Sequence, residues 1–161
     1  MPALGRGELI RPFSLRSPQG DEVHTDEFHG RFNLVLVFAE ELERPSLQAL
    51  LQSYARVQEA FREQEAGVLF VLRRVASEGE PRAGDVSAVS VLIDREGETH
   101  ELYDISDDPA VYVTDRWGEV YAVYPEPRSL PGPETVLKDL EFINHQCPEC
   151  FPPEWPQQGA A

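Results

Sequence analysis

The feature that most constrains the fold is a short apolar run that leads into an amphipathic segment. The run is Asn33-Leu34-Val35-Leu36-Val37-Phe38, and a continuous β-branched and aliphatic run of this length is typical of a strand buried on both faces in the middle of a sheet. Beyond residues 39–45, apolar residues recur at helical spacing, namely Leu47, Leu50, Leu51, Tyr54, Val57 and Phe61. We therefore predict a central strand that leads, through a short loop, into a helix ending at Gly67.

The rest of the chain alternates between apolar runs and turn signals. Residues 11–26 predict a hairpin-like entry to the fold. The elements predicted after the helix are, in order, a strand over 68–72, a strand over 89–94, a turn over 95–98, an antiparallel hairpin over 110–124 and a helix from Pro133. A strand, a helix and a strand in succession predict a parallel pair, so the strand over 68–72 should lie beside the central strand.

Length and charge restrict the classes of partner. We expect one domain over residues 1–146 and an irregular tail over residues 147–161 that carries four prolines. Lys and Arg number 14 against 29 Asp and Glu, so the formal net charge is -15, which repels phosphate backbones and anionic membrane surfaces. No stretch approaches the roughly 20 apolar residues of a membrane-spanning helix, and the first residues lack the apolar core of a signal peptide. The expected protein is cytoplasmic and binds neither nucleic acid nor membranes.

The loop after the central strand is the first place to look for a site. In open α/β sheets, ligands bind beyond the carboxyl ends of the strands, often facing a helix N-terminus. Residues 39–45 contain no Cys, His, Ser or Thr, and they offer three glutamates, one arginine and one proline. The loop therefore lacks the nucleophile that the architecture leads us to expect.

Three stretches, taken together, resemble a known family. They are Arg11-Pro12-Phe13-Ser14-Leu15 with Gly20 and Phe28-His29-Gly30-Arg31, then Val91-Leu92-Ile93-Asp94 with Gly97 and Tyr103, and finally Asp108-Pro109-Ala110-Val111-Tyr112-Val113-Thr114-Asp115-Arg116-Trp117-Gly118. In this order they resemble the thioredoxin superfamily, and within it the peroxiredoxin-like redoxin proteins of the alkyl hydroperoxide reductase and thiol-specific antioxidant type. The resemblance covers most of residues 11–145. It implies an α/β, thioredoxin-like fold with a mixed central sheet of about five strands and helices on both faces, and a redox, antioxidant function.

The same resemblance shows what this chain lacks. The family's chemistry needs a cysteine just before the first core helix, where the helix N-terminus stabilises a thiolate. Leu42 and Pro45 occupy the two positions where the thioredoxin-like register places cysteines. Pro109 matches the family's cis-proline, which implies a cis peptide bond beside this empty site. We predict that Pro109 faces Leu42 and Pro45 across a shallow cleft and that no peroxidase activity arises from this loop.

Acidic residues are expected around this cleft. The fold would bring together carboxylates from two loops, namely Glu40, Glu41, Glu43, Asp107 and Asp108. Such a cluster could hold a hard cation or a basic peptide. We prefer the simpler interpretation, because acidic residues are favoured at a helix N-terminus and are expected on the surface of a protein with this charge.

The two cysteines form the one reactive motif, Cys147-Pro148-Glu149-Cys150. This spacing suits a redox pair or half of a zinc site with His145 as a third ligand, and a second copy of the chain could complete that site in a homodimer. A third interpretation is two small buried thiols. Apart from zinc, we expect no cofactor. The remaining histidines, His24, His29 and His100, lie in polar or turn contexts, so we predict that they are on the surface.

Two classes of function remain open. The first is a thiol-disulfide oxidoreductase or peroxide-related enzyme whose chemistry depends on Cys147 and Cys150, with a protein thiol or disulfide as its partner. The second is a non-catalytic binding or adaptor protein. Chain direction predicts that the last helix runs away from the cleft, which should place Cys147 about 15 to 20 Å from Leu42.

Overall fold

The computed structural model describes residues 4–41, 45–74, 88–105, 109–125 and 130–146. Seven strands form one sheet in the order β2-β1-β5-β4-β3-β6-β7. The strands are β1 (Ser14–Arg16), β2 (Glu22–His24), β3 (Asn33–Ala39), β4 (Ala66–Leu72), β5 (Val89–Ile93), β6 (Ala110–Thr114) and β7 (Val120–Pro125). The helices are η1 (Thr25–Glu27, 3-10), α1 (Pro45–Arg56), α2 (Gln58–Glu63), α3 (Glu98–Leu102) and α4 (Pro133–Asn144). No helix in these described ranges is long and apolar enough to cross a membrane.

The sheet is mixed, as predicted. β3 pairs in parallel with β4 and antiparallel with β6, β4 pairs in parallel with β5, and β6 and β7 form the predicted hairpin. Seven strands are present instead of about five, because the predicted entry hairpin consists of two strands, β1 and β2. It joins the sheet through a single pair, Arg16 with Ile93. Strands of three residues are too short to show the alternation that identifies a strand in a sequence.

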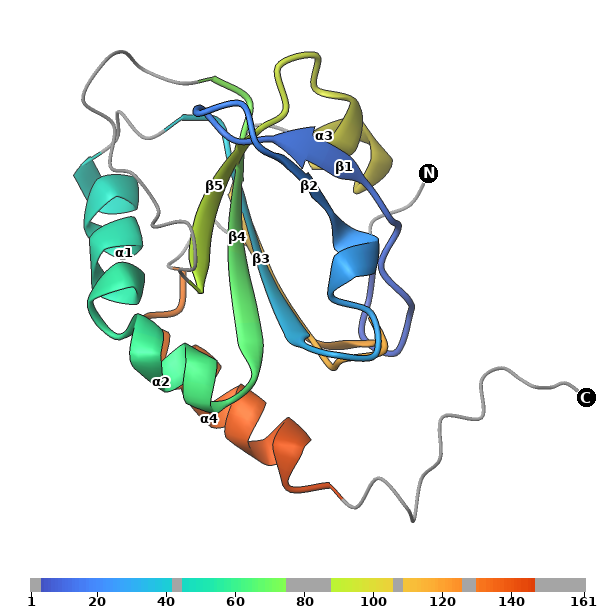
Figure 1. The fold of residues 1–161 in the computed structure, drawn as a ribbon, viewed down its shortest axis with the longest axis vertical. Coiled ribbons are helices and arrows are strands. Elements are labelled where there is room, and N and C mark those ends of the chain that lie inside the picture. Colours follow the sequence, from blue (N-terminus) through green and yellow to red (C-terminus); the bar gives the residue numbers. More distant parts are fainter. Residues whose placement is uncertain (1–3, 42–44, 75–87, 106–108, 126–129, 147–161) are drawn as a thin grey trace, which may run out of the picture.

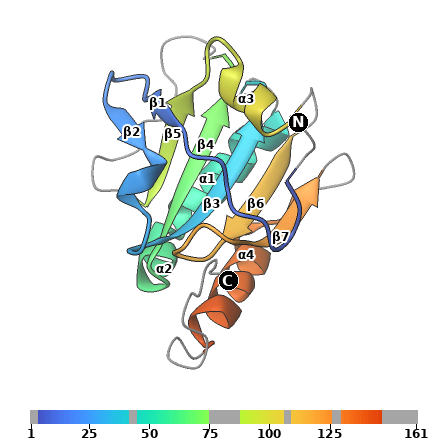
Figure 2. The same cartoon turned by 90° about the vertical axis from the view of Figure 1, so that its right-hand side faces the viewer.

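Each face of the sheet carries its own core, because successive side chains of a strand point to opposite sides. Val35 and Val37 pack on one face with side chains from α1, α2 and α4, whereas Leu36 and Phe38 pack on the other with Tyr103. Figure 1 shows α1, α2 and α4 together on one side of the sheet, with α3 and the β1-β2 hairpin on the other. Figure 2 shows that second face, which the N-terminal segment crosses. Every residue of β3 is buried, which confirms that it is the central strand.

The predicted single helix up to Gly67 is wrong. α1 ends at Arg56, Val57 leaves the helical conformation, and α2 continues to Glu63. The turn into β4 is made by Glu65, which has a positive φ of 54°. Gly67 lies within β4, where a Cβ would lie 2.6 Å from a ring carbon of Phe28. Glycine is needed there for close packing rather than for ending a helix.

Candidate functional site

The carboxyl end of β3 lies where the fold places chemistry, and β4, β5 and β6 adjoin it. Ala39, the last residue of β3, pairs with Leu72 of β4. Ala110 of β6 pairs with Phe38, so Pro109, which is buried, lies beside this end of β3. Leu42 and the residue before Pro109 lie outside the described residues, so the predicted cleft and the predicted cis bond stay predictions. Pro45 is the first residue of α1.

Two arginines at the end of β4 engage the glutamates at the end of β3. Glu40 lies 3.7 Å from a guanidinium nitrogen of Arg73 and 3.0 Å from one of Arg74, and Glu41 lies 3.4 Å from Arg74. The backbone amides of both arginines also donate to the Glu40 carbonyl oxygen, at 3.1 and 3.0 Å. Arginine-carboxylate contacts of this kind neutralise charge and orient both groups.

The predicted acidic cluster is therefore described only in part. Glu40 and Glu41 contact arginines, whereas Glu43, Asp107 and Asp108 lie outside the described residues. Within the ranges that the structure describes, no group of three or more His, Cys, Asp or Glu side chains is arranged to hold a metal ion.

Next to these arginines lies a buried pair that sequence reasoning missed. His100 is 1% exposed and Asp94 is 2% exposed, so the prediction that His100 lies on the surface is wrong. The Asp94 carboxylate accepts hydrogen bonds from the backbone amides of Thr99 (3.2 Å) and His100 (2.7 Å), and it lies 2.7 Å from Nδ1 of the His100 ring. Asp94 thus caps the amino end of α3, a short helix that begins at Glu98, the last residue of the predicted turn.

His100 links this cap to the candidate site. Its Nε2 lies 3.1 Å from the carbonyl oxygen of Ala39, immediately before the glutamates. Which of the two ring nitrogens donates depends on the tautomer of the ring. The His100 ring thus lies between the Asp94 carboxylate and the last carbonyl group of β3.

The charge state of Asp94 follows from its surroundings. Burial alone would raise the pKa of the carboxyl group, but the hydrogen bonds from the His100 ring and from the amides of His100 and Thr99 outweigh it, and the pKa is lowered. Asp94 is consequently an ionised anchor rather than a proton donor at neutral pH. Sequence signals for this anchor existed, because an aspartate at the end of an apolar run, followed by Gly97 and Thr99, is a pattern that favours a helix start.

α4 ends at the opposite end of β3. The side-chain amide of Asn33, the first residue of β3, donates to the side-chain oxygen of Asn144 (2.9 Å), and the side-chain amide of Asn144 donates to the Gln64 carbonyl oxygen (2.7 Å). Cys147 and Cys150 lie outside the described residues, so the predicted separation from Leu42 stays a prediction. His145 is exposed, and its Nδ1 lies 2.7 Å from the Glu141 carbonyl oxygen, which leaves Nε2 as the nitrogen that could bind zinc.

Comparison with known proteins identifies the fold. No family model and no curated protein matches the chain. The reduced 2-Cys peroxiredoxin of Plasmodium vivax matches with a TM-score of 0.71 and 18% identity, over 87% of this chain and 96% of that chain. Mycobacterium bovis AhpC matches with a TM-score of 0.71 and 17% identity, over 90% of this chain and 95% of that chain.

A more distant structure, from Chlorobium tepidum and assigned as the thiol:disulfide interchange protein DsbE, matches with a TM-score of 0.62 and 17% identity, over 88% of this chain and 96% of that chain. These low identities establish the fold alone. The chain has a thioredoxin-like fold of the kind seen in peroxiredoxins, which confirms the resemblance read from the sequence at the level of fold.

Proposed function

We propose that this chain is a peroxiredoxin-like redox protein in which thiol-disulfide exchange at Cys147 and Cys150 takes the place of chemistry at the loop before α1. One observation carries the proposal: a chain with this fold has no cysteine in that loop, and its only two thiols form a Cys-x-x-Cys pair. A pair with this spacing can form a disulfide within one short segment.

The proposed partner is a protein disulfide. The Cys147 thiolate attacks one sulfur of the partner's disulfide and forms a mixed disulfide, which releases the other sulfur as a thiolate. The Cys150 thiolate then attacks Cys147, and the partner leaves with its second sulfur reduced. Two electrons pass to the partner, and the two protons lost by the cysteines are taken up by its two new thiols.

The position of the pair in the sequence favours a disulfide over a peroxide as substrate. In the sequence, two residues, His145 and Gln146, separate Cys147 from Asn144, the last residue of α4, and the C-terminal end of a helix is electronegative. A helix C-terminus disfavours a thiolate, so it does not provide the low thiol pKa that fast peroxide attack requires. Exchange with a disulfide tolerates a thiol whose pKa is near its ordinary value.

A second candidate is a non-catalytic binding protein. The side-chain contacts at the carboxyl end of β3 support it, because they suit a site that has lost its chemistry. Contacts of Glu40 and Glu41 with Arg73 and Arg74 occupy this end of the sheet, and the His100 ring lies 3.1 Å from the carbonyl oxygen of Ala39. A fold can keep such an architecture while its chemistry is lost, because function depends on the side chains of the site.

One experiment separates the two candidates. The reduced protein is mixed with glutathione disulfide, the release of thiol is followed over time, and Cys147→Ser, Cys150→Ser and Leu42→Ala are compared with the unchanged chain. We expect the unchanged chain and Leu42→Ala to release two thiols per chain, Cys150→Ser to release one and stop as a mixed disulfide, and Cys147→Ser to release none. Exchange that survives in Cys147→Ser, or that is absent from all four proteins, contradicts the redox proposal. Zinc bound at one ion per two chains, and lost in Cys147→Ser, would instead support a zinc-stabilised homodimer through Cys147, Cys150 and His145.

A further inference from the structure

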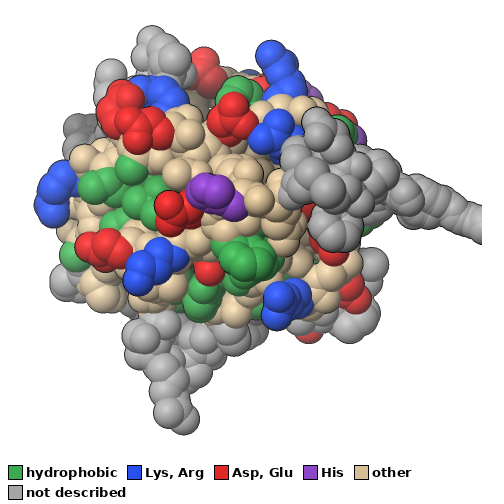
Figure 3. Space-filling model, turned by 90° about the horizontal axis from the view of Figure 1, so that it is seen from below, with side chains coloured by type: hydrophobic (Ala, Val, Ile, Leu, Met, Phe, Trp, Pro, Cys, Tyr) green, Lys and Arg blue, Asp and Glu red, His purple; other side chains and the backbone are tan. Residues whose placement is uncertain are grey.

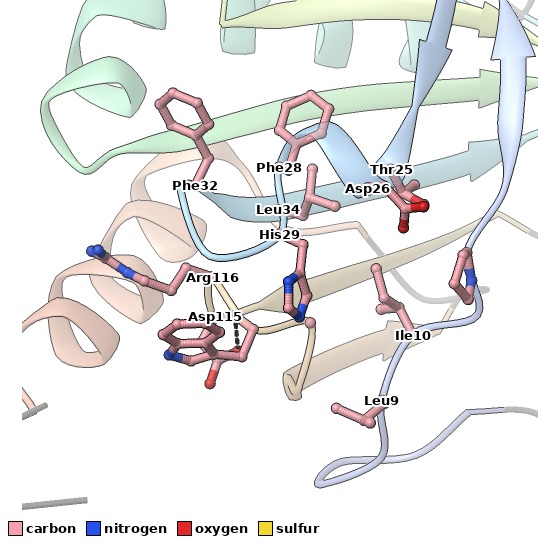
Figure 4. Close-up of a pocket in the computed structure, with 13 residues that line it drawn as sticks. Leu9, Ile10, Thr25, Asp26, Phe28, His29, Phe32, Leu34, Asp115 and Arg116 are labelled. Carbon is pink, nitrogen blue, oxygen red and sulfur yellow. Dashed lines mark hydrogen bonds between the residues drawn. The ribbon is translucent and has the colours of Figure 1, made fainter. Parts of the chain in front are cut away.

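A pocket of about 480 Å³ opens at the amino end of β3, opposite the site described above. We call it the amino-end pocket. Three segments line it: the N-terminal segment with Leu9 and Ile10, the stretch from Thr25 to Phe32 before β3, and the β6-β7 turn with Asp115 and Trp117. Figure 4 shows side chains from these three segments converging on one space. A volume of this size lies within the range of ligand pockets, roughly 300 to 1,000 Å³.

Backbone hydrogen bonds hold the three segments together, so the pocket is formed before anything binds. The Ile10 amide donates to the Gly118 carbonyl oxygen (2.8 Å), and the Gly30 amide donates to the Arg116 carbonyl oxygen (2.7 Å). Gly30 has a positive φ of 78°, and a Cβ there would lie 3.4 Å from the Trp117 ring, so glycine permits the close approach. A preformed pocket saves a ligand part of the ordering cost of binding.

The rim of the pocket exposes apolar surface. Three large hydrophobic side chains are exposed in the described part of the chain, namely Leu9 (47%), Phe32 (41%) and Phe142 (55%), and the first two line the pocket. On the pocket wall, the exposed His29 ring lies edge-on to Trp117, with centroids 5.6 Å apart. Figure 3 shows hydrophobic side chains gathered around a histidine on this end of the molecule. Clustered exposed apolar groups of this kind mark interaction sites.

The charges around the pocket favour a cationic partner. Asp26 is exposed on the rim, and Asp115 is partly buried, with one oxygen accepting from the Trp117 and Glu119 amides at 2.9 Å. The single arginine of the lining, Arg116, lies 2.7 Å from Glu65, which offsets its charge. A second copy of a chain with a net charge of -15 would be repelled, as would a nucleic acid or an anionic membrane.

We propose that the amino-end pocket binds a segment of a partner protein that presents an aromatic or large aliphatic side chain flanked by lysine or arginine. The apolar anchor enters between the three segments, and the flanking cations face Asp26 and Asp115. A chain segment rather than a small molecule is the occupant, because Leu9 and Phe32 belong to different walls and a crossing segment covers both. This inference does not depend on the cysteines, so it stands or falls separately from the redox proposal.

The test uses the full chain and a fluorescein-labelled peptide of ten residues that carries one tryptophan between pairs of arginines in a glycine-serine background. Fluorescence anisotropy is measured against three peptides: this one, one with alanine in place of tryptophan, and one with glutamate in place of each arginine. We expect the first peptide to bind at least tenfold more tightly than either of the others, because one buried aromatic anchor supplies most of the energy of such an interface. Its affinity should also fall as salt rises.

Variants locate the binding surface. Phe32→Ser should weaken binding about tenfold, and Asp26→Asn should weaken it about threefold. Phe142→Ser is the matched control, because Phe142 is at least as exposed but lies on α4, outside the lining, and its affinity should be unchanged. Circular dichroism and melting curves show whether each variant is folded.

Several outcomes would overturn the proposal. They are equal affinity for all three peptides, no binding of the first peptide at millimolar concentration, and an equal loss in Phe142→Ser and Phe32→Ser. A dimer in sedimentation analysis that Phe32→Ser abolishes would identify a second copy as the occupant. Binding that is seen only after serine replaces Phe151 and Trp155 would identify the chain's own tail.

Discussion

Replacing Asp94 by asparagine should lower the free energy of unfolding by about 3 kcal/mol. The carboxylate accepts two backbone hydrogen bonds at the start of α3 and lies 2.7 Å from the His100 ring, and both side chains are almost completely buried. Hydrogen bonds to a charged group contribute roughly 1.5 to 3 kcal/mol each, and a buried donor left without an acceptor costs roughly 1 to 3 kcal/mol. Asparagine keeps one oxygen that can accept one of the three hydrogen bonds, so we place the loss at about 3 kcal/mol, the equivalent of one or two such bonds.

The loss should depend on pH in a defined direction. The pKa of Asp94 is lowered in the folded protein, so its carboxylate contributes stability that is fully present above the unfolded pKa, which is about 4. That contribution is lost as the pH falls through the lower, folded value. The difference in stability between the unchanged chain and Asp94→Asn should therefore be large at pH 5.5 and smaller at pH 3.

Urea unfolding followed by tryptophan fluorescence measures both effects. With a slope of about 2 kcal/mol/M, a loss of 3 kcal/mol moves the midpoint down by about 1.5 M. Asp104→Asn is the matched control, because Asp104 is an exposed residue just after α3 with a positive φ that asparagine also tolerates. A loss below 1 kcal/mol in Asp94→Asn, an equal loss in the control, or a difference that is the same at both pH values would refute the role given to this pair.

Two further changes test the packing of the sheet. Gly67→Ala should lower the free energy of unfolding by about 1 to 3 kcal/mol, because its Cβ would lie 2.6 Å from the Phe28 ring. Gly5→Ala is the control: a Cβ at Gly5 would have no atom within 4 Å, so the melting temperature should be unchanged. Tyr54→Phe should cost about 1 kcal/mol in urea unfolding, because it removes a buried hydrogen bond of 3.0 Å to the Pro131 carbonyl oxygen. Burial raises the pKa of Tyr54, so Tyr54→Phe should not reduce the rise in 295 nm absorbance between pH 10 and 11, and a reduction by one tyrosine would contradict this.

The central strand could be predicted because its signal is local. All of Leu34 to Phe38 is buried, and an uninterrupted apolar run reports burial on both faces directly. The break at Val57 could not be predicted, because Tyr54, Val57 and Phe61 keep helical spacing across it. Tyr54 and Phe61 even stack, with ring centroids 5.4 Å apart, so the apolar face is continuous although the helix is not.

One feature of the candidate site could be predicted from the sequence, namely which residue types its loop lacks. The absence of a cysteine between Phe38 and Pro45 is visible in the sequence itself. The contacts of Arg73 and Arg74 with Glu40 could also have been predicted, because both arginines directly follow the apolar run of β4, and the carboxyl ends of parallel strands meet at one edge. Long-range pairing of this kind follows from topology rather than from local pattern.

His100 shows where local reasoning ends. Its neighbours Glu98, Thr99 and Glu101 make it look like part of an exposed turn. Its burial is produced by residues distant in the sequence: the Phe38 ring lies edge-on at 5.3 Å, and the Ala39 carbonyl oxygen lies 3.1 Å from Nε2. A polar residue is buried when a tertiary structure supplies partners for all its polar atoms, and a single sequence does not show whether it will.

The two ends of β3 therefore have different chemical characters. At the carboxyl end, the described polar side chains contact one another: Glu40 contacts Arg73 and Arg74, and Asp94 contacts the His100 ring. Among the described residues of this end, these contacts engage side chains that could otherwise bind a partner. At the amino end, Leu9 and Phe32 are exposed around a preformed pocket with acidic groups on its rim. Burial of exposed apolar surface drives binding. Among the described residues, the amino end of β3 therefore offers a partner more such surface than the carboxyl end, where α/β folds usually place their chemistry.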